Sequence, residues 1–286
     1  MQLLAPAKIN LHLRIGPPRA DGFHPLLSWM ATIGLFDTLT FDVGQDGQIT
    51  LTCDEPTIPC DDRNLVIRAA KLLRLGANYS AKIHLGKKIP HGGGLGGGSS
   101  NAAFALLGLN DFWNLKKPMN ELDHAAAQLG SDINFFLHGP SSICSGRGEI
   151  VRSIGLPSIA RWVMLVLPDI AMPTPAVYRQ FDQMKLGRDA DVHNEPDWNQ
   201  WAALPSQDLL HKLVNDLEAA AFAIQPELGN LRESIEKTAD RPVRMSGSGS
   251  SLFTLYDDQM EAENAAKSMM DNHSCRAIAV ELCPNV

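Results

Sequence analysis

The sequence predicts an α+β protein with two lobes. A chain of 286 residues exceeds the usual size of one domain, so two domains, or one large domain with an added lobe, are expected. In the first half, strand patterns come before helix patterns, and a second set of strands and helices begins after Gly155. The boundary is predicted near residues 152–157, which gives an N-terminal domain over residues 1–154 and a C-terminal domain over residues 155–286.

The first predicted strand covers residues 7–15, where apolar and polar residues alternate strictly. The polar positions are Lys8, Asn10, His12 and Arg14. Because successive side chains point to opposite faces of a strand, one face is expected to be buried and the other solvated, and Lys8 by itself would be a solvated side chain. Three more strands are predicted at residues 39–43, 49–53 and 82–85, which favours an antiparallel-rich sheet.

Three helices are predicted in the N-terminal half from capping residues and apolar faces. They cover residues 64–75 with Asn64 as cap and Gly76 as stop, residues 99–109 with Ser99 or Ser100 as cap, and residues 120–129 with Gly130 as stop. In this half, strands therefore come first and helices follow.

The C-terminal half is predicted to be an α+β unit of its own. Its strands are predicted at residues 162–167, 243–245, 252–256 and 277–282, and its helices at residues 208–224, 226–237 and 259–271. Between them, the polar residues 181–206 are too many for a simple turn, so they form either a flexible insertion or a lid on the substrate side.

Composition and charge narrow the class of protein. The net charge is −7 and the pI is about 5.7, which disfavours general nucleic-acid binding and requires local cations at any phosphate site. The five cysteines show no metal or redox spacing, and no apolar run is long enough to cross a membrane. A cytoplasmic protein, either a monomer or a homodimer, is therefore expected, with neither nucleic acid nor membrane as a partner.

A glycine run is the strongest functional motif. Six of the seven residues 92–98 are glycine, so no Cβ atom keeps a ligand away from the backbone amides, which can form an anion nest. The helix predicted after it would direct its positive end at bound phosphates. The alternative is a flexible linker, but linkers do not usually stand between a strand and a capped apolar helix. The predicted phosphate-binding residues of this run are Pro90, Gly92, Gly93, Gly94, Leu95, Gly96, Gly97, Gly98, Ser99 and Ser100.

Three known nucleotide motifs do not account for this run. Residues 92–97 satisfy G-x-G-x-x-G, but that fingerprint should follow directly on a strand, whereas Lys87, Lys88, Ile89 and Pro90 intervene here. The P-loop pattern and the protein-kinase motifs are both missing from the sequence. The run is therefore a phosphate loop of another kind.

Three motifs together resemble the GHMP kinase superfamily. They are Pro-Ala-Lys-Ile-Asn-Leu at residues 6–11, Gly-Leu-Gly-Gly-Gly-Ser-Ser at 94–100 and Met-Ser-Gly-Ser-Gly at 245–249. Residues 20–24 and 131–133 add similarity to members that phosphorylate a cytidine diphosphate-linked methylerythritol. The resemblance implies a ribosomal S5 domain 2-like N-terminal lobe, a ferredoxin-like C-terminal lobe, an active site between them, and use of ATP with Mg2+.

The resemblance also assigns roles to residues. It implies that Asp132 is the catalytic base and that Lys8 orients it, although the setting of Asp132 alone favours a helix N-cap. It places Gly247, Ser248 and Gly249 beside the phosphates, where the pattern alone would predict a hairpin turn. The substrate-binding residues that it implies are Asn10, Phe23, His24, Thr174 and Tyr178.

Two alternative functions and the identity of the metal ligands remain open. The chain could be another GHMP kinase acting on mevalonate, homoserine or a sugar, or a nucleotide-binding sensor without catalysis. The metal ligands are not assigned, although Ser99 or Ser100 is a plausible ligand of Mg2+.

Overall fold

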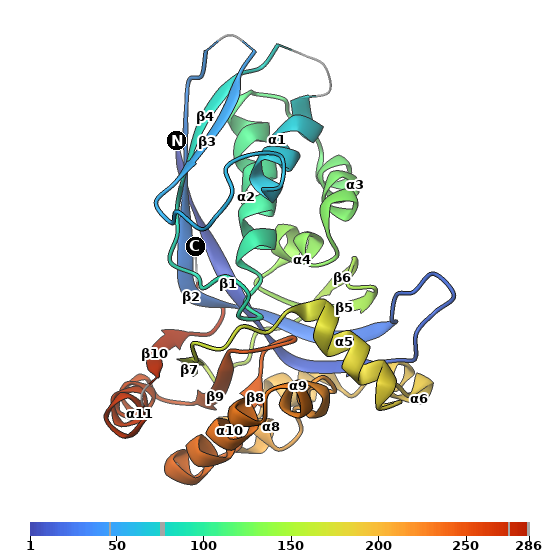
Figure 1. Ribbon diagram of the computed structural model, residues 1–286, viewed down its shortest axis with the longest axis vertical. Coiled ribbons are helices and arrows are strands. Elements are labelled where there is room, and N and C mark those ends of the chain that lie inside the picture. Colours follow the sequence, from blue (N-terminus) through green and yellow to red (C-terminus); the bar gives the residue numbers. More distant parts are fainter. Residues whose placement is uncertain (46, 75–77, 274, 285–286) are drawn as a thin grey trace.

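The computed structural model describes residues 1–45, 47–74, 78–273 and 275–284. In this part of the chain the strands form a six-stranded sheet and a four-stranded sheet (Figure 1). Figure 1 shows the long strands β1 and β2 extending from the first lobe toward the second, so that the two lobes meet along them. A two-lobed α+β fold is thus confirmed.

The first sheet has the order β3-β4-β2-β5-β6, with β1 paired to β2, and only the pair β3 and β4 is parallel. Its strands are β1 (Gln2–Ile15), β2 (Leu26–Asp42), β3 (Ile49–Cys53), β4 (Ala81–Gly86), β5 (Ser141–Gly146) and β6 (Ile150–Ser153). Four helices lie together on one side of it (Figure 1), namely α1 (Leu65–Arg74), α2 (Gly97–Phe112), α3 (Met119–Leu129) and α4 (Ile133–His138). An antiparallel-rich sheet was predicted, and it is confirmed.

The second sheet is antiparallel, in the order β10-β7-β9-β8. Its strands are β7 (Trp162–Leu167), β8 (Arg244–Met245), β9 (Leu252–Tyr256) and β10 (Arg276–Glu281). Its helices are α5 (Thr174–Gln183), α6 (Asp189–His193), α7 (Trp198–Ala202), α8 (Ser206–Leu210), α9 (Glu218–Ile224), α10 (Pro226–Ala239) and α11 (Gln259–Asn272). No helix of the described residues is long and apolar enough to span a bilayer.

The two lobes share their hydrophobic core. Both core clusters contain residues from each half of the chain. Backbone contacts also join the halves, because Cys283 N donates to Thr32 O at 2.8 Å and Leu13 N donates to Val214 O at 2.8 Å. The division at residue 154 therefore stays a prediction, since packing continues across it.

Strand β1 is buried on both faces, so the expected solvated face is wrong. The glycine run covers Lys8, and the indole of Trp198 in α7 packs against His12. Residues 181–206, predicted to be an insertion or lid, contain α6 and α7 and bury Val192 and Trp198 in the core. The polar face of β1 is thus buried because segments distant in the sequence pack against it.

His12 gives this burial a measurable consequence. Its ring is 6% exposed and lies edge-on to Trp198 and Trp201, and burial, reinforced by the charge of Arg14, lowers its pKa from 6.5 to about 3. Below pH 6.5 the unfolded chain binds a proton here that the folded protein binds only near pH 3. The neutral ring therefore makes its full contribution to the free energy of unfolding above pH 6.5. As the pH falls from 6.5 toward 3, the free energy of unfolding should fall by up to about 1.4 kcal/mol per pH unit.

Urea unfolding of the wild type and of His12→Gln at about pH 7, 6 and 5 checks this expectation. The variant should show a shallower loss of stability with acid, since Gln does not titrate. Equal slopes in the two proteins would contradict a neutral, buried His12.

Two further differences concern helices. The helix predicted over residues 208–224 is divided into α8 and α9, because residues between them bond to the end of β1: Asp216 N donates to Leu13 O at 3.0 Å. Helix α5 was missed because Pro175 lies in its first turn, where proline is compatible with a helix.

Candidate active site

A cavity of about 810 Å3 lies where the two lobes meet. It is lined from β1, the glycine run, the start of α2, the loop before α4, helix α5 and the loop after β8. This volume is typical of small-molecule sites, which measure about 300–1,000 Å3. Most of the residues singled out in the sequence converge here.

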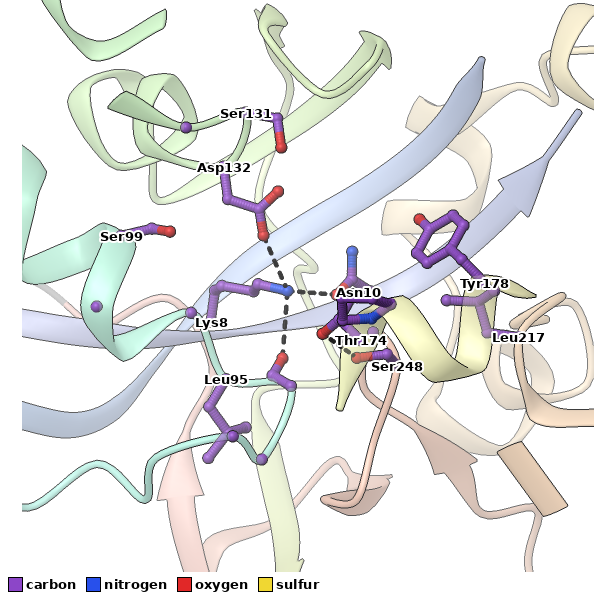
Figure 2. Close-up of a pocket in the computed structure, with 18 of the residues that line it drawn as sticks. Lys8, Asn10, Leu95, Ser99, Ser131, Asp132, Thr174, Tyr178, Leu217 and Ser248 are labelled. Atoms are coloured by element: carbon purple, nitrogen blue, oxygen red, sulfur yellow. Dashed lines mark hydrogen bonds and ion pairs between the residues drawn. The ribbon is translucent and has the colours of Figure 1, made fainter. Parts of the chain in front are cut away.

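Lys8 lies at the centre of the cavity wall (Figure 2), although only 3% of it is exposed. Its Nζ lies 2.5 Å from Asn10 Oδ1, 3.2 Å from Gly94 O and 3.5 Å from Asp132 Oδ2. Asn10 Nδ2 donates to Ser28 Oγ at 2.8 Å, which turns the amide oxygen toward the ammonium. Three oxygen acceptors therefore hold this buried cation in one position.

Asp132 occupies the N-cap position of α4, but no backbone N–H donates to its side chain. Its carboxylate instead points toward Lys8 and is 31% exposed (Figure 2). The predicted cap position is thus confirmed, while the side chain stays available to a ligand. Burial raises the pKa of the Cys144 thiol to about 12, and burial together with the charge of Asp132 raises the pKa of Tyr178, so neither neighbour accepts a proton near neutral pH.

The glycine run requires glycine at specific positions. Gly92, Gly94 and Gly96 have φ values of +74°, +75° and +67°, which side chains disfavour. A Cβ on Gly94 would lie 2.1 Å from Ser246 O, and a Cβ on Gly96 would lie 3.0 Å from Lys8 Cγ. Gly94 and Gly96 therefore allow the run to pack closely against both lobes.

The run is fixed in place by its one apolar residue and by backbone bonds. Leu95 is 1% exposed and belongs to the hydrophobic core, and Lys8 N donates to Leu95 O at 3.0 Å. On the side of the second lobe, Ser251 N donates to Gly93 O at 3.2 Å. The glycine run is therefore a packed segment, and the alternative of a flexible linker is wrong.

Helix α2 begins at Gly97, so the prediction that Ser99 or Ser100 caps it is wrong. Gly96, in the left-handed conformation, occupies the N-cap position, and both serines lie in the first turn. Ser100 N donates to Gly96 O at 2.8 Å, while the N–H groups of Gly97, Gly98 and Ser99 have no acceptor among the described residues. Free N–H groups at a helix N-terminus are suited to phosphate.

A buried carboxylate positions the segment before the run. Asp37 is fully buried and accepts from Lys87 Nζ at 2.7 Å, Lys88 N at 2.7 Å, Ile89 N at 2.8 Å and Asn101 Nδ2 at 3.0 Å. A buried charge is tolerated only when it is paired and hydrogen-bonded, as it is here. Lys87, which the sequence reading missed, is thereby held as a second cation on the cavity wall.

Aromatic residues line the other end of the cavity. Phe23, 52% exposed, follows β1, and the guanidinium of Arg147 lies 4.9 Å from its ring centroid. The buried His24 ring lies 5.2 Å from Tyr178 of α5. A planar ring could stack here.

The loop after β8 contributes two of its three predicted residues. Gly247 and Ser248 line the cavity, and Ser248 Oγ lies 2.8 Å from Thr174 Oγ1. Gly249 does not line it and packs against Met245, and Ser100 is fully buried outside it. All other predicted site residues line this single cavity.

Four charged residues of the cavity wall were missed, namely Lys87, Arg147, Arg179 and Asp182. None stands in a pattern that separates it from a solvated surface charge. The two glycines flanking Arg147, with φ values of +71° and +116°, were the only local signal of an unusual turn.

Comparisons with known proteins agree with this geometry. Residues 64–140 match the GHMP kinases N terminal domain and residues 201–273 match the GHMP kinases C terminal domain. A 4-diphosphocytidyl-2-C-methyl-D-erythritol kinase of Synechococcus sp. (strain CC9605) is 37% identical over 91% of this chain and 89% of its own. One of Nocardioides sp. (strain ATCC BAA-499 / JS614) is 38% identical over 93% and 91%.

A solved structure gives the same result in three dimensions. The crystal structure of a 4-(cytidine 5'-diphospho)-2C-methyl-D-erythritol kinase superposes with a TM-score of 0.80 at 32% identity, over 100% of both chains. Similarity of this extent in sequence and fold covers both lobes and the cavity between them. The chain therefore belongs to the 4-diphosphocytidyl-2-C-methyl-D-erythritol kinase family of the GHMP kinases.

Proposed function

We propose that this protein transfers the γ-phosphoryl group of ATP to the 2-hydroxyl of 4-diphosphocytidyl-2-C-methyl-D-erythritol, giving the 2-phosphate and ADP in the non-mevalonate isoprenoid pathway. One observation carries the proposal: the pair Lys8 and Asp132 lies between a helix N-terminus suited to phosphates and an aromatic pocket suited to a base. A phosphoryl donor and a cytidylated acceptor can thus meet at one carboxylate. The family membership supports this choice of acceptor.

The chemistry assigned to the chain is positioning, charge neutralisation and one proton transfer. The N–H groups at the start of α2 and the ammonium of Lys8 hold the phosphates of ATP. As the acceptor hydroxyl oxygen bonds to the γ-phosphorus and the bond to ADP breaks, Asp132 accepts the hydroxyl proton. Asn10 faces the same point and can bind an acceptor hydroxyl.

The aromatic end is proposed to hold the cytosine ring between Phe23 and Tyr178, with His24 at its edge. Arg147, stacked on Phe23, faces the cavity as a cation for the acceptor's diphosphate. Thr174 adds a hydroxyl beside the phosphate loop.

Mg2+ is proposed to accompany ATP. Within the described residues no group of three or more His, Cys, Asp or Glu could hold a metal alone. Magnesium prefers oxygen ligands, keeps several waters and binds largely through phosphates, so a single hydroxyl suffices. Ser99 fits because it lines the cavity at the first turn of α2, whereas Ser100 is buried outside it. When bound there, the ion would neutralise phosphate charge.

A cytoplasmic monomer or homodimer is proposed, and the net charge of −7 supports the absence of a nucleic-acid partner. The function is tested by measuring ADP release with 4-diphosphocytidyl-2-C-methyl-D-erythritol, mevalonate, homoserine and a panel of sugars. Turnover is expected with the first acceptor only. Activity restricted to an uncytidylated alcohol would refute the proposal, and tight ATP binding without transfer to any acceptor would indicate a sensor.

A further inference from the structure

A second cavity, of about 290 Å3, lies away from the candidate active site. It is lined from β1, from residues 191–201 around α6 and α7, and from the segment that follows α8. Among the described residues, none lines both cavities. Its volume is close to the lower end of the range for small-molecule sites, about 300–1,000 Å3. The proposed phosphoryl transfer assigns no role to this second cavity.

A β-bulge in β1 divides its polar side chains between the two cavities. The register with β2 shifts between Asn10 and His12, which leaves one extra residue on β1 there. Lys8 and Asn10 line the candidate active site before the bulge, and Leu13 lines it after the bulge. Because successive side chains alternate, His12 and Arg14 point to the opposite face, where they line the second cavity.

His12 brings a hydrogen-bond donor to this cavity. Val214 N donates to its Nδ1 at 3.4 Å, so Nδ1 carries no proton and the neutral ring has its N–H at Nε2. The ring is neutral near pH 7 because burial lowers its pKa to about 3. Nε2 has no acceptor among the described residues, and His12, 6% exposed, lines the cavity. A largely buried N–H group of this kind requires an acceptor from a ligand or water.

The acidic residues of the cavity wall are already paired with arginines. The guanidinium of Arg14 lies between Asp191 and Asp216, with Nη1 3.3 Å from Asp216 Oδ1. Glu195 forms an ion pair with Arg152. The carboxylates that line the cavity are therefore compensated, and they do not leave a site that attracts a cation.

The groups that lack a partner include two more N–H donors. The ammonium of Lys212 and the indole N–H of Trp201 have no acceptor within the part of the chain that the structure describes, and both residues line the cavity. Together with His12, they bring donors from β1, from α7 and from the segment after α8. A ligand that satisfies several donors at once must carry several oxygen acceptors on one group, as a carboxylate or a phosphate does.

We propose that the second cavity binds a small anion by its carboxylate or phosphate group, held by His12 Nε2–H, the indole N–H of Trp201 and the ammonium of Lys212. His12 donates without carrying a charge, so the electrostatic attraction for the anion comes from Lys212, whose side chain is exposed at the rim. The site is separate from the proposed transfer reaction, because its residues lie on the other face of β1.

The test follows the indole N–H signals of the five tryptophans by heteronuclear NMR while inorganic phosphate or acetate is added at constant ionic strength. No tryptophan of the described ranges lines the candidate active site, so the Trp201 signal reports on the second cavity. This signal is assigned by its loss in Trp201→Phe. It should shift and saturate with a Kd of about 1–10 mM for at least one of the anions. Tighter binding of phosphate would indicate a phosphorylated ligand, and tighter binding of acetate a carboxylate.

Two variants test the donors. Lys212→Gln and His12→Phe should each weaken binding about tenfold, the usual scale for a hydrogen bond to a charged group. The matched control is Lys267→Gln on α11, because Lys267 is also exposed but lies outside both cavities, and it should keep the wild-type affinity. Equal affinities in the wild type and Lys212→Gln, or a Trp201 signal that does not saturate with either anion, would overturn the proposal. Either result would leave the proposed phosphoryl transfer intact.

Discussion

Asp132→Asn is expected to lower kcat by roughly 10²-fold or more, the usual scale for losing a positioned proton acceptor. ATP affinity should stay within about twofold of the wild type, because the N–H groups of α2 that are proposed to bind its phosphates lie on another element. The Asp132 side chain accepts no bond from α4, and Asn keeps its size, so α4 should remain folded. Lys8 also keeps its acceptors Asn10 Oδ1 and Gly94 O, which limits the cost of removing the charge.

Single-turnover kinetics and ATP calorimetry together test this expectation. Asp169→Asn is the control, because Asp169 is an exposed residue outside the cavity. A drop in kcat with unchanged thermal stability supports Asp132 as the base. Near-wild-type turnover in Asp132→Asn would show that Asp132 is not the base.

Gly94→Ala is expected to lower the free energy of unfolding by about 2–5 kcal/mol and to abolish measurable ATP binding. Its φ of +75° is costly for Ala, by about 1–2 kcal/mol. A Cβ would also lie 2.1 Å from Ser246 O, so the run must move away from the second lobe, which adds about 1–3 kcal/mol. Because Gly94 O also accepts from Lys8, that movement should displace the ammonium from the phosphate site.

Gly92→Ala is the matched control, since Gly92 has nearly the same φ, +74°, but no atom lies within 4 Å of an added Cβ. It should cost only the backbone strain of about 1–2 kcal/mol and retain ATP binding. Urea unfolding gives the free energy of unfolding of both variants, and calorimetry gives their affinity for ATP. The difference between the variants separates the cost of the backbone conformation, which both share, from the cost of the contact with Ser246, which only Gly94→Ala makes. Equal losses of stability in the two would contradict a tight contact between the run and Ser246.

Elements with complete local signals were predicted well. Asn64 caps α1 as expected, with Val66 N donating to its Oδ1 at 2.9 Å, although the predicted end at Leu75 and Gly76 lies outside the described residues. Strands β3, β7 and β9 have the predicted bounds, and α3 ends at Gly130. A cap, a stop and a periodic apolar face are properties of neighbouring residues, so the sequence contains them in full.

Elements whose surroundings come from elsewhere in the chain were predicted poorly. Residues 26–38 of β2 were missed, and the stretch from Leu26 to Ile33 is buried on both faces and therefore lacks alternation. The serine caps of α2 were wrong because Gly96 lies under the Lys8 side chain and must adopt the left-handed conformation there. In both cases a tertiary contact outweighed the local pattern.

By itself, the sequence determined that this protein has a glycine run before a helix, a two-lobed α+β fold and the motifs of a GHMP kinase, because glycine runs, periodicity and motif spacing are local. Only the tertiary structure decided that Lys8 is a buried cation held by Asn10, Gly94 and Asp132, and that Asp182 lies 3.4 Å from His24 in the same cavity. These partners are separated by up to 158 positions of the sequence. Whether a side chain is solvated, paired or free for chemistry depends on which distant segments pack against it.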